Sequence, residues 1–157
     1  TFRAILDTIE DNDPTFTVLI IGQSYNLLNH DHFSALGAAI GENTHLTELK
    51  IDVSSINQSD ISTFQSLFDG LKHNSSICKL HLKGDNRNTL SDVGIEILRA
   101  YQANSNQLTQ FTIEYFVPLQ QNGGGGIVAD TLRCCTNLKT IDLQASFDPG
   151  TDLGSFP

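Results

Sequence analysis

Leu46-Thr47-Glu48-Leu49-Lys50-Ile51 contains the pattern that decides the fold: apolar, two residues, apolar, one residue, apolar. The pattern occurs five times in the 157 residues, with its first positions 30 or 31 residues apart. The five copies begin at Phe16, Leu46, Ile77, Leu108 and Leu138. An internal spacing that recurs at a nearly constant period predicts a chain of stacked structural repeats.

The apolar spacing within each unit predicts a strand followed by a helix. The last two apolar residues of each copy are two positions apart, so they lie on one face of a strand. After the first four copies the apolar residues step by three and four, as at Phe33, Leu36 and Ile40, which is typical of a helix with one buried stripe. We therefore expect strands near residues 18–22, 48–52, 79–83, 110–114 and 140–144, and helices near 32–42, 61–73, 91–103 and 127–135.

A unit made of one strand and one helix cannot bury its apolar face alone. Stacked units align their strands, so we expect an α/β solenoid with a curved parallel sheet on the concave side and α-helices on the convex side. Residues 1–15 are interpreted as the end of a preceding repeat or as a cap. Repeats then start at 16, 46, 77 and 108, a half repeat spans 138–157, and the whole chain, 1–157, forms a single domain. Because no helix follows the last strand, we expect the solenoid to continue or to be covered there.

Polar residues next to the helical stripes suggest where the helices begin and end. Asp31 precedes the first stripe, Ser59 or Asp60 the second and Ser91 the third, and each is a suitable N-cap residue. Three asparagines, which tolerate the left-handed conformation common after a helix, follow these stripes. They are Asn43, Asn74 and Asn104.

The repeat unit resembles a known family. Leu46-Thr-Glu-Leu49-Lys-Ile51 with its following helix is similar to the leucine-rich repeat, and the long helical half resembles its ribonuclease-inhibitor-like branch. The chain departs from the family at the position three after the last apolar residue. The family usually has Asn there, whereas this chain has Ser24, Ser54, Asp85, Phe116 and Ser146. The resemblance implies a fold and leaves the function open.

The composition excludes several classes of partner. The formal net charge is −9, from 9 basic and 18 acidic residues. Such an acidic chain does not favour nucleic acid, because phosphate binding needs clustered Lys and Arg. The longest apolar run, Val18 to Ile21, is far too short to span a bilayer. We therefore predict no nucleic-acid partner and no membrane insertion.

The concave face is the first candidate site. Parallel stacking places side chains from successive strands in columns, so that Glu48, Lys79 and Gln110 form one column and Asp52, Lys83 and Glu114 another. These charges either pair across the strands on a solvated face or form a polar surface that docks a protein. The predicted partner-binding residues on this face are Glu48, Lys50, Asp52, Lys79, His81, Lys83, Gln110, Thr112 and Glu114. Val18 and Ile20 in the first strand are apolar, and we interpret them as a contact with a missing unit or a partner.

A loop in the fourth repeat is the second candidate. Tyr115 and Phe116 lie where a loop is normally polar, and the glycines from 123 to 126 stand where the helix is expected to begin. The favoured interpretation is a flexible loop whose aromatic residues pack on the rim of the solenoid, with a protruding recognition loop as the alternative.

Cysteine usage and motifs support neither a metal site nor a cofactor. The three cysteines, Cys78, Cys134 and Cys135, have no companion Cys or His at metal-site spacing, so we interpret them as small buried residues in a reducing, cytoplasmic compartment. Two glycosylation sequons, at Asn57 and Asn74, keep a secreted origin open. We predict no metal and no cofactor.

The function expected from the sequence is that of a non-enzymatic protein-protein interaction scaffold that binds a partner through the concave face and the repeat-four loop, so Tyr115 and Phe116 are also predicted binding residues. An alternative is a structural or cytoskeletal subunit of a larger assembly, because residues 41–52 are similar to repeats of the actin-capping tropomodulins and to many unrelated chains. A second alternative is a GTPase-activating protein of the Ran type. That family uses a loop arginine, for which Arg87 is the loose counterpart.

Overall fold

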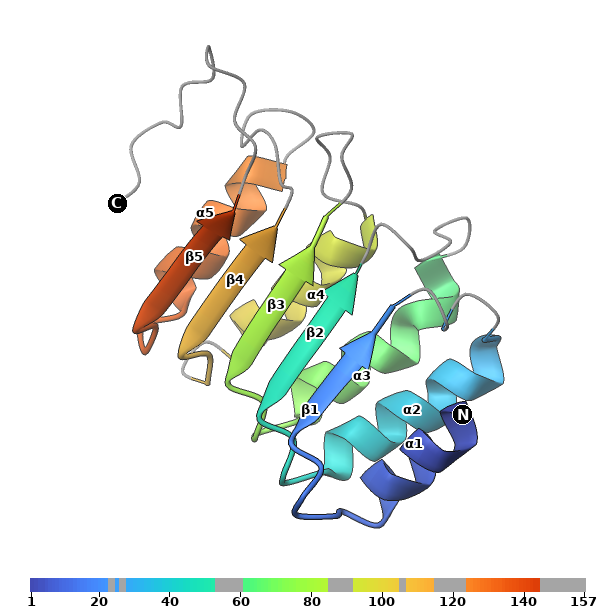
Figure 1. Cartoon of the computed structure of the whole chain (residues 1–157). Coiled ribbons are helices and arrows are strands. Elements are labelled where there is room, and N and C mark those ends of the chain that lie inside the picture. The colour runs from blue at the N-terminus through green and yellow to red at the C-terminus, as the bar shows by residue number, and fades with distance from the viewer. Residues whose placement is uncertain are drawn as a thin grey trace.

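The protein folds as a single sheet with helices along one face (Figure 1). The computed structural model describes residues 1–22, 25, 28–52, 61–84, 92–104, 107–114 and 124–144. Five strands lie in chain order, and every neighbouring pair is parallel. The predicted leucine-rich-repeat-type α/β architecture is confirmed.

The strands match the predicted positions closely. They are β1 (Val18–Ile21), β2 (Glu48–Asp52), β3 (Lys79–Lys83), β4 (Gln110–Glu114) and β5 (Thr140–Gln144). The first strand ends one residue before the predicted limit, because the Gly22 carbonyl accepts a turn hydrogen bond from the Tyr25 amide. The apolar pattern therefore sets the register, since a slip of one residue would turn every core side chain outward.

The helices also follow the repeat. They are α1 (Phe2–Glu10), α2 (His30–Glu42), α3 (Gln65–His73), α4 (Asp92–Ala103) and α5 (Gly124–Cys134), with a 3-10 turn, η3 (Ile61–Phe64), directly before α3. α5 starts three residues earlier than predicted, so Gly124, Gly125 and Gly126 belong to its first turn rather than to a loop. The N-terminal helix α1 lies beside α2 and buries Leu6 and Ile9 (Figure 1).

The apolar positions of the repeat form one continuous core between sheet and helices. Leu49, Leu80 and Phe111 occupy matching positions on neighbouring strands and are each 1% exposed or less. Ile141 holds the corresponding position on the edge strand β5, where it is 50% exposed. In the described part of the chain, the core is thus closed by α1 at the β1 end and less covered at the β5 end.

Two predictions about the residues that cap the helices were wrong: the N-cap of α2 and the left-handed conformation of the asparagines that follow helices. The N-cap of α2 is Asn29, whose side chain accepts from the His32 amide, and not Asp31, which lies in the first turn. Asn43 and Asn74 have φ of −72° and −64°, so they are extended and not left-handed. The predicted caps Ser59, Asp60 and Ser91 lie outside the described residues.

Asn43 and Asn74 instead tie successive repeats together. The Asn74 amide nitrogen donates to the carbonyls of Ile40 and Asn43 in the preceding repeat, at 2.7 and 2.9 Å. Its side-chain oxygen accepts from the backbone amides of Ser76 and Ile77, at 2.9 and 2.8 Å. Asn43 donates in the same way to the Ile9 carbonyl. These bonds satisfy backbone groups at the turns that lead from α2 to β2 and from α3 to β3.

Candidate protein-binding surface

The predicted binding residues on β2, β3 and β4 occupy one face of the sheet. Strand alternation places the core residues on the helix-covered side, so the residues between them point to the concave face. The register pairs Glu48 with Lys79, and Lys79 with Gln110, as the sequence predicted. It likewise pairs Asp52 with Lys83, and Lys83 with Glu114. The helices lie behind this face, which they leave uncovered (Figure 1).

Many charges on the concave face are paired within the protein. The Lys83 ammonium lies 3.5 Å from the Asp52 carboxylate on the neighbouring strand. The His81 ring lies 3.3 Å from the Glu114 carboxylate.

Within β2, Lys50 and Glu48 are 3.5 Å apart. Such exposed pairs stabilise a fold by only about 0.2–1 kcal/mol each. The face is therefore polar and several of its charges are paired, across strands in the contacts of Lys83 and His81, as one of the two interpretations of the sequence expected.

The remaining predicted residues differ in accessibility. Lys79 is exposed and has no ion-pair partner among the residues that the structure describes. Thr112 is only 7% exposed, so it offers little surface to a partner despite its outward register position. Tyr115, Phe116 and Arg87 lie outside the described residues.

The first strand adds an apolar edge to the concave face. Ile20 is 62% exposed, the highest value among the exposed large apolar side chains of the described residues. Val18 lies next to it on the same face and is partly exposed. The sequence marked both residues as a contact, although neither belongs to the predicted set of charged and polar binding residues.

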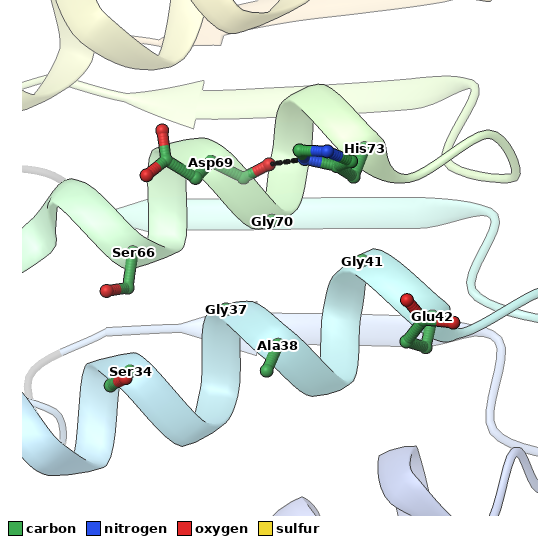
Figure 2. Close-up of a pocket in the computed structure, with 9 residues that line it drawn as sticks. All are labelled: Ser34, Gly37, Ala38, Gly41, Glu42, Ser66, Asp69, Gly70 and His73. Atoms are coloured by element: carbon green, nitrogen blue, oxygen red, sulfur yellow. Dashed lines mark hydrogen bonds between the residues drawn. The ribbon is translucent and has the colours of Figure 1, made fainter.

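The sequence did not predict a groove on the opposite, helical side. It has a volume of about 350 Å³ and lies between α2 and α3 (Figure 2). It is lined by small residues such as Gly37, Gly41 and Gly70, and the His73 ring nitrogen donates to the Asp69 carbonyl at 2.9 Å. A Cβ atom on Gly37 would lie 2.0 Å from the Ser66 carbonyl oxygen, and one on Gly70 would lie 2.1 Å from the Gly37 carbonyl oxygen, so these two glycines are explained by the close approach of the two helices.

The cysteines only partly match the prediction that they are buried. Cys135 is 2% exposed, whereas Cys134 is exposed and Cys78 is intermediate. Across the described ranges, no group of three or more His, Cys, Asp or Glu side chains could hold a metal ion. None of the described helices is long and apolar enough to cross a membrane.

One of the two glycosylation sequons is not usable in the folded chain. Asn74 is 1% exposed, and its side-chain nitrogen, the atom that would carry a glycan, donates two hydrogen bonds. Asn57 lies outside the described residues.

Because the protein buries a thiol and two phenol groups, we predict that it loses stability in alkaline solution. Burial, together with the neighbouring Cys134, raises the pKa of Cys135 from 9.0 to about 11. Burial also raises the pKa of Tyr25 and, with a contribution from Cys78, that of Tyr101.

The unfolded chain loses these protons first, so the contribution of Cys135 to stability is complete below pH 9 and is lost as the pH rises toward 11, and that of the two tyrosines is lost from about pH 10 upward. We expect Cys135 alone to lower the free energy of unfolding by about 2 kcal/mol across that window. Urea titrations at a series of pH values measure the free energy of unfolding of the wild type and of Cys135→Ala. Between pH 9 and 11 this free energy should fall less steeply in the variant. Parallel curves would contradict the assignment.

Comparisons with known proteins agree with the fold. No family model and no curated protein sequence matches the chain. Among solved structures, it is similar to leiomodin-1 actin-binding site 2, with 18% identity, a TM-score of 0.61 and coverage of 93% of this chain and 80% of that one. It is also similar to the tropomodulin C-terminal domain of Caenorhabditis elegans, with 11% identity, a TM-score of 0.58 and coverage of 93% and 84%. At these identities the likeness shows a shared fold.

Proposed function

We propose that the chain is a non-enzymatic scaffold that binds a protein partner through the concave face, with the repeat-four loop around Tyr115 and Phe116 as a second contact. The observation that carries the proposal is the set of polar side chains aligned in register on three adjacent strands, on a face that the helices leave open. Repeat solenoids commonly bind through such concave surfaces. We further propose a cytoplasmic location and a place in the ribonuclease-inhibitor-like branch, on the cysteine usage and the helix length.

Site-specific photocrosslinking tests this proposal. A photoreactive amino acid at Gln110 on the concave face should link a protein from the native source, and one at Ala38 on α2 should not. The crosslinked partner is then purified and its affinity for the free chain is measured. Equal crosslinking at both positions, or none at Gln110, would reject the concave face as the binding surface.

The Lys83→Glu variant should weaken a partner bound at this face. It removes the ion pair to Asp52 and places a third carboxylate beside Asp52 and Glu114. We expect an affinity about threefold to tenfold lower, or about 0.7–1.4 kcal/mol. Isothermal titration calorimetry with the purified partner measures this change.

The matched control is Lys72→Glu, which reverses an exposed charge near the end of α3 on the helical side. Thermal melts separate binding from stability, because stacked carboxylates on adjacent strands also destabilise the fold slightly. Unchanged affinity and unchanged melting in Lys83→Glu would exclude the centre of the concave face from the interface.

Regulation of actin is the second candidate function. The structure of leiomodin-1 actin-binding site 2 shares its fold over 93% of this chain, and residues 41–52 resemble tropomodulin repeats. If the chain acts in this way, it should co-sediment with actin filaments or slow the elongation of pyrene-labelled actin. Lys83→Glu should reduce the effect, and Lys72→Glu should not. An absence of both activities at micromolar concentration would remove actin as the partner and leave the broader proposal in place.

A further inference from the structure

We propose that the β1–β3 corner of the concave face, formed by Val18, Ile20 and Lys79, docks an amphipathic helix of the partner protein. That helix presents one apolar side chain and one carboxylate seven residues apart. The inference rests on the proposed function in one respect only, namely that the concave face is the binding surface. What it adds is the chemistry and the secondary structure of the partner segment that binds at this corner.

The apolar half of the corner is Ile20 with Val18. Both side chains stand on the concave face of the edge strand, away from the core that Leu19 and Ile21 enter. Ile20 leaves 62% of its surface in water. An exposed isoleucine gains free energy when a partner covers it, at about 25 cal/mol per Å² of apolar area. The exposed surface of Val18 and Ile20 therefore favours contact with an aliphatic or aromatic side chain of the partner.

The charged half of the corner is Lys79. Its register neighbours are Glu48 on one side and the neutral Gln110 on the other. The Glu48 carboxylate lies 3.5 Å from the Lys50 ammonium, and among the described residues no carboxylate pairs with Lys79. Within the described part of the chain, Lys79 is thus an exposed cation with no paired carboxylate, whereas the ammonium groups of Lys50 and Lys83 on the same face are paired. Charge complementarity calls for a carboxylate on the partner at this position.

The distance between the two halves selects a helix. Val18, Glu48 and Lys79 form one column across three strands, which spans about 9.6 Å at a strand spacing of about 4.8 Å. Ile20 lies two residues, or about 6.7 Å, along its strand from that column, so it is about 12 Å from Lys79. A spacing between about 10 and 12 Å therefore covers both apolar residues. Seven residues of an α-helix rise about 10.5 Å and return to the same helix face. In an extended strand three residues cover a similar length, about 10 Å, but residues three apart point to opposite sides.

The middle strand of the corner sets a further requirement. On β2 the facing side chains are Glu48 and Lys50, which pair with each other. The partner residue between its apolar and acidic positions should therefore be small and uncharged. The chain carries a net charge of −9 and therefore repels an acidic partner at long range. The partner carboxylate attracts Lys79 only at contact distance, because salt screens the charges beyond it. The outer face of the partner helix should therefore not be acidic.

The test is an NMR titration of the ¹⁵N-labelled full chain with designed peptides. The probe is a capped 21-residue alanine-glutamine helix with a leucine at its seventh position and a glutamate seven residues later. Comparison peptides replace the glutamate by glutamine or by lysine, or the leucine by glutamine. A proline-rich peptide with leucine and glutamate three residues apart tests an extended occupant, because polyproline II places such residues on one face about 9 Å apart.

We expect the probe to shift the amide signals of Ile20 and Lys79. Replacing its glutamate by glutamine should weaken binding about twofold to fivefold, the effect of one exposed ion pair. The Lys79→Glu variant should lose more affinity for the original probe than the wild type loses when the probe's glutamate is replaced by glutamine. The same variant should bind the lysine peptide again. Ile20→Thr, which keeps a β-branched residue in the strand, should weaken every helical peptide. Lys72→Glu is the control that leaves all affinities unchanged.

Three outcomes overturn the inference: no shift at Ile20 and Lys79, shifts that Lys79→Glu leaves unaltered, or tighter binding of the proline-rich peptide. Thermal melts of each variant confirm that it is folded. A partner crosslinked at Gln110 while all helical peptides fail would leave the proposed function standing and reject only the helix. Peptide binding at the corner without any concave-face partner in the crosslinking experiment would reject the proposed function alone.

Discussion

Gly70→Ala is expected to destabilise the protein by about 3 kcal/mol or more, the upper range for overpacking a core. A Cβ atom at this position would lie 2.1 Å from the Gly37 carbonyl oxygen and 2.8 Å from its Cα atom. These are backbone atoms, so no side chain can rotate away, and α2 and α3 would have to separate. Urea denaturation followed by circular dichroism measures the loss. A decrease in melting temperature of about 10 °C should accompany it.

Gly41→Ala is the matched control on α2, because it makes the same chemical change in the same helix pair. Its Cβ atom would meet the nearest atoms of His73 and Gly70 at 3.5 and 3.6 Å, which are ordinary van der Waals contacts. Alanine favours a helix over glycine by about 1 kcal/mol, so this variant should be slightly more stable than the wild type. Equal effects of the two substitutions would show that α2 and α3 do not pack as closely as the structure places them.

The elements could be predicted from the sequence because their apolar positions carry two periods at once. The step of two within each motif sets which side chains of a strand enter the core, and the period of 30 or 31 residues sets which strands are neighbours. Leu49, Leu80 and Phe111 therefore fell into register without any structural information. The columns of the concave face followed from the same register.

The contacts between repeats could not be predicted, since they depend on distances that no spacing encodes. Gly37 and Gly70 appear in the sequence only as residues that weaken a helix, and their role depends on how closely α2 approaches α3. The choice of ion pairs on the concave face depends on side-chain reach. Glu48 has Lys50 on its own strand and Lys79 beside it on the next strand. It contacts Lys50, so Lys79 has no paired carboxylate among the described residues. The exposure of Ile20 was foreseen because its position alternates with the core residues of the strand.

The asparagines show the same limit. An Asn just after a helix is compatible with a left-handed cap and with a side chain that bridges to the preceding repeat. The sequence favoured the first interpretation, and the structure has the second at Asn43 and Asn74. Among the described residues other than glycine, the left-handed one is Asn12, with φ of 53°, whose side chain bonds to Thr44.

Asn74→Ala is expected to cost about 3–5 kcal/mol. The side chain is 1% exposed and makes hydrogen bonds to two carbonyls of the preceding repeat and two amides of its own turn. Alanine would remove the bonds to all four backbone groups, although the Asn43 carbonyl keeps its bond from the Ser76 hydroxyl and the Ile40 carbonyl its bond from the Asn43 amide. The amides of Ser76 and Ile77 would lose their acceptor, and an unsatisfied buried group costs about 1–3 kcal/mol unless water reaches it. The free energy of unfolding from urea titration gives the loss. Hydrogen exchange should show faster exchange at the Ser76 and Ile77 amides.

Asn74→Asp separates the two halves of this hydrogen-bond set. A carboxylate keeps the shape and can still accept from the amides of Ser76 and Ile77, but it cannot donate to the carbonyls of Ile40 and Asn43. The variant should therefore be as unstable as the alanine variant near pH 7 and should recover part of the loss at acidic pH, where the protonated acid regains a donor. Ser75→Ala, in the same turn and exposed, is the control and should change stability by less than about 0.5 kcal/mol. If Asn74→Ala were as mild as this control, the bridging bonds would not stabilise the stack. The repeats would then be held together by their apolar core and the parallel sheet.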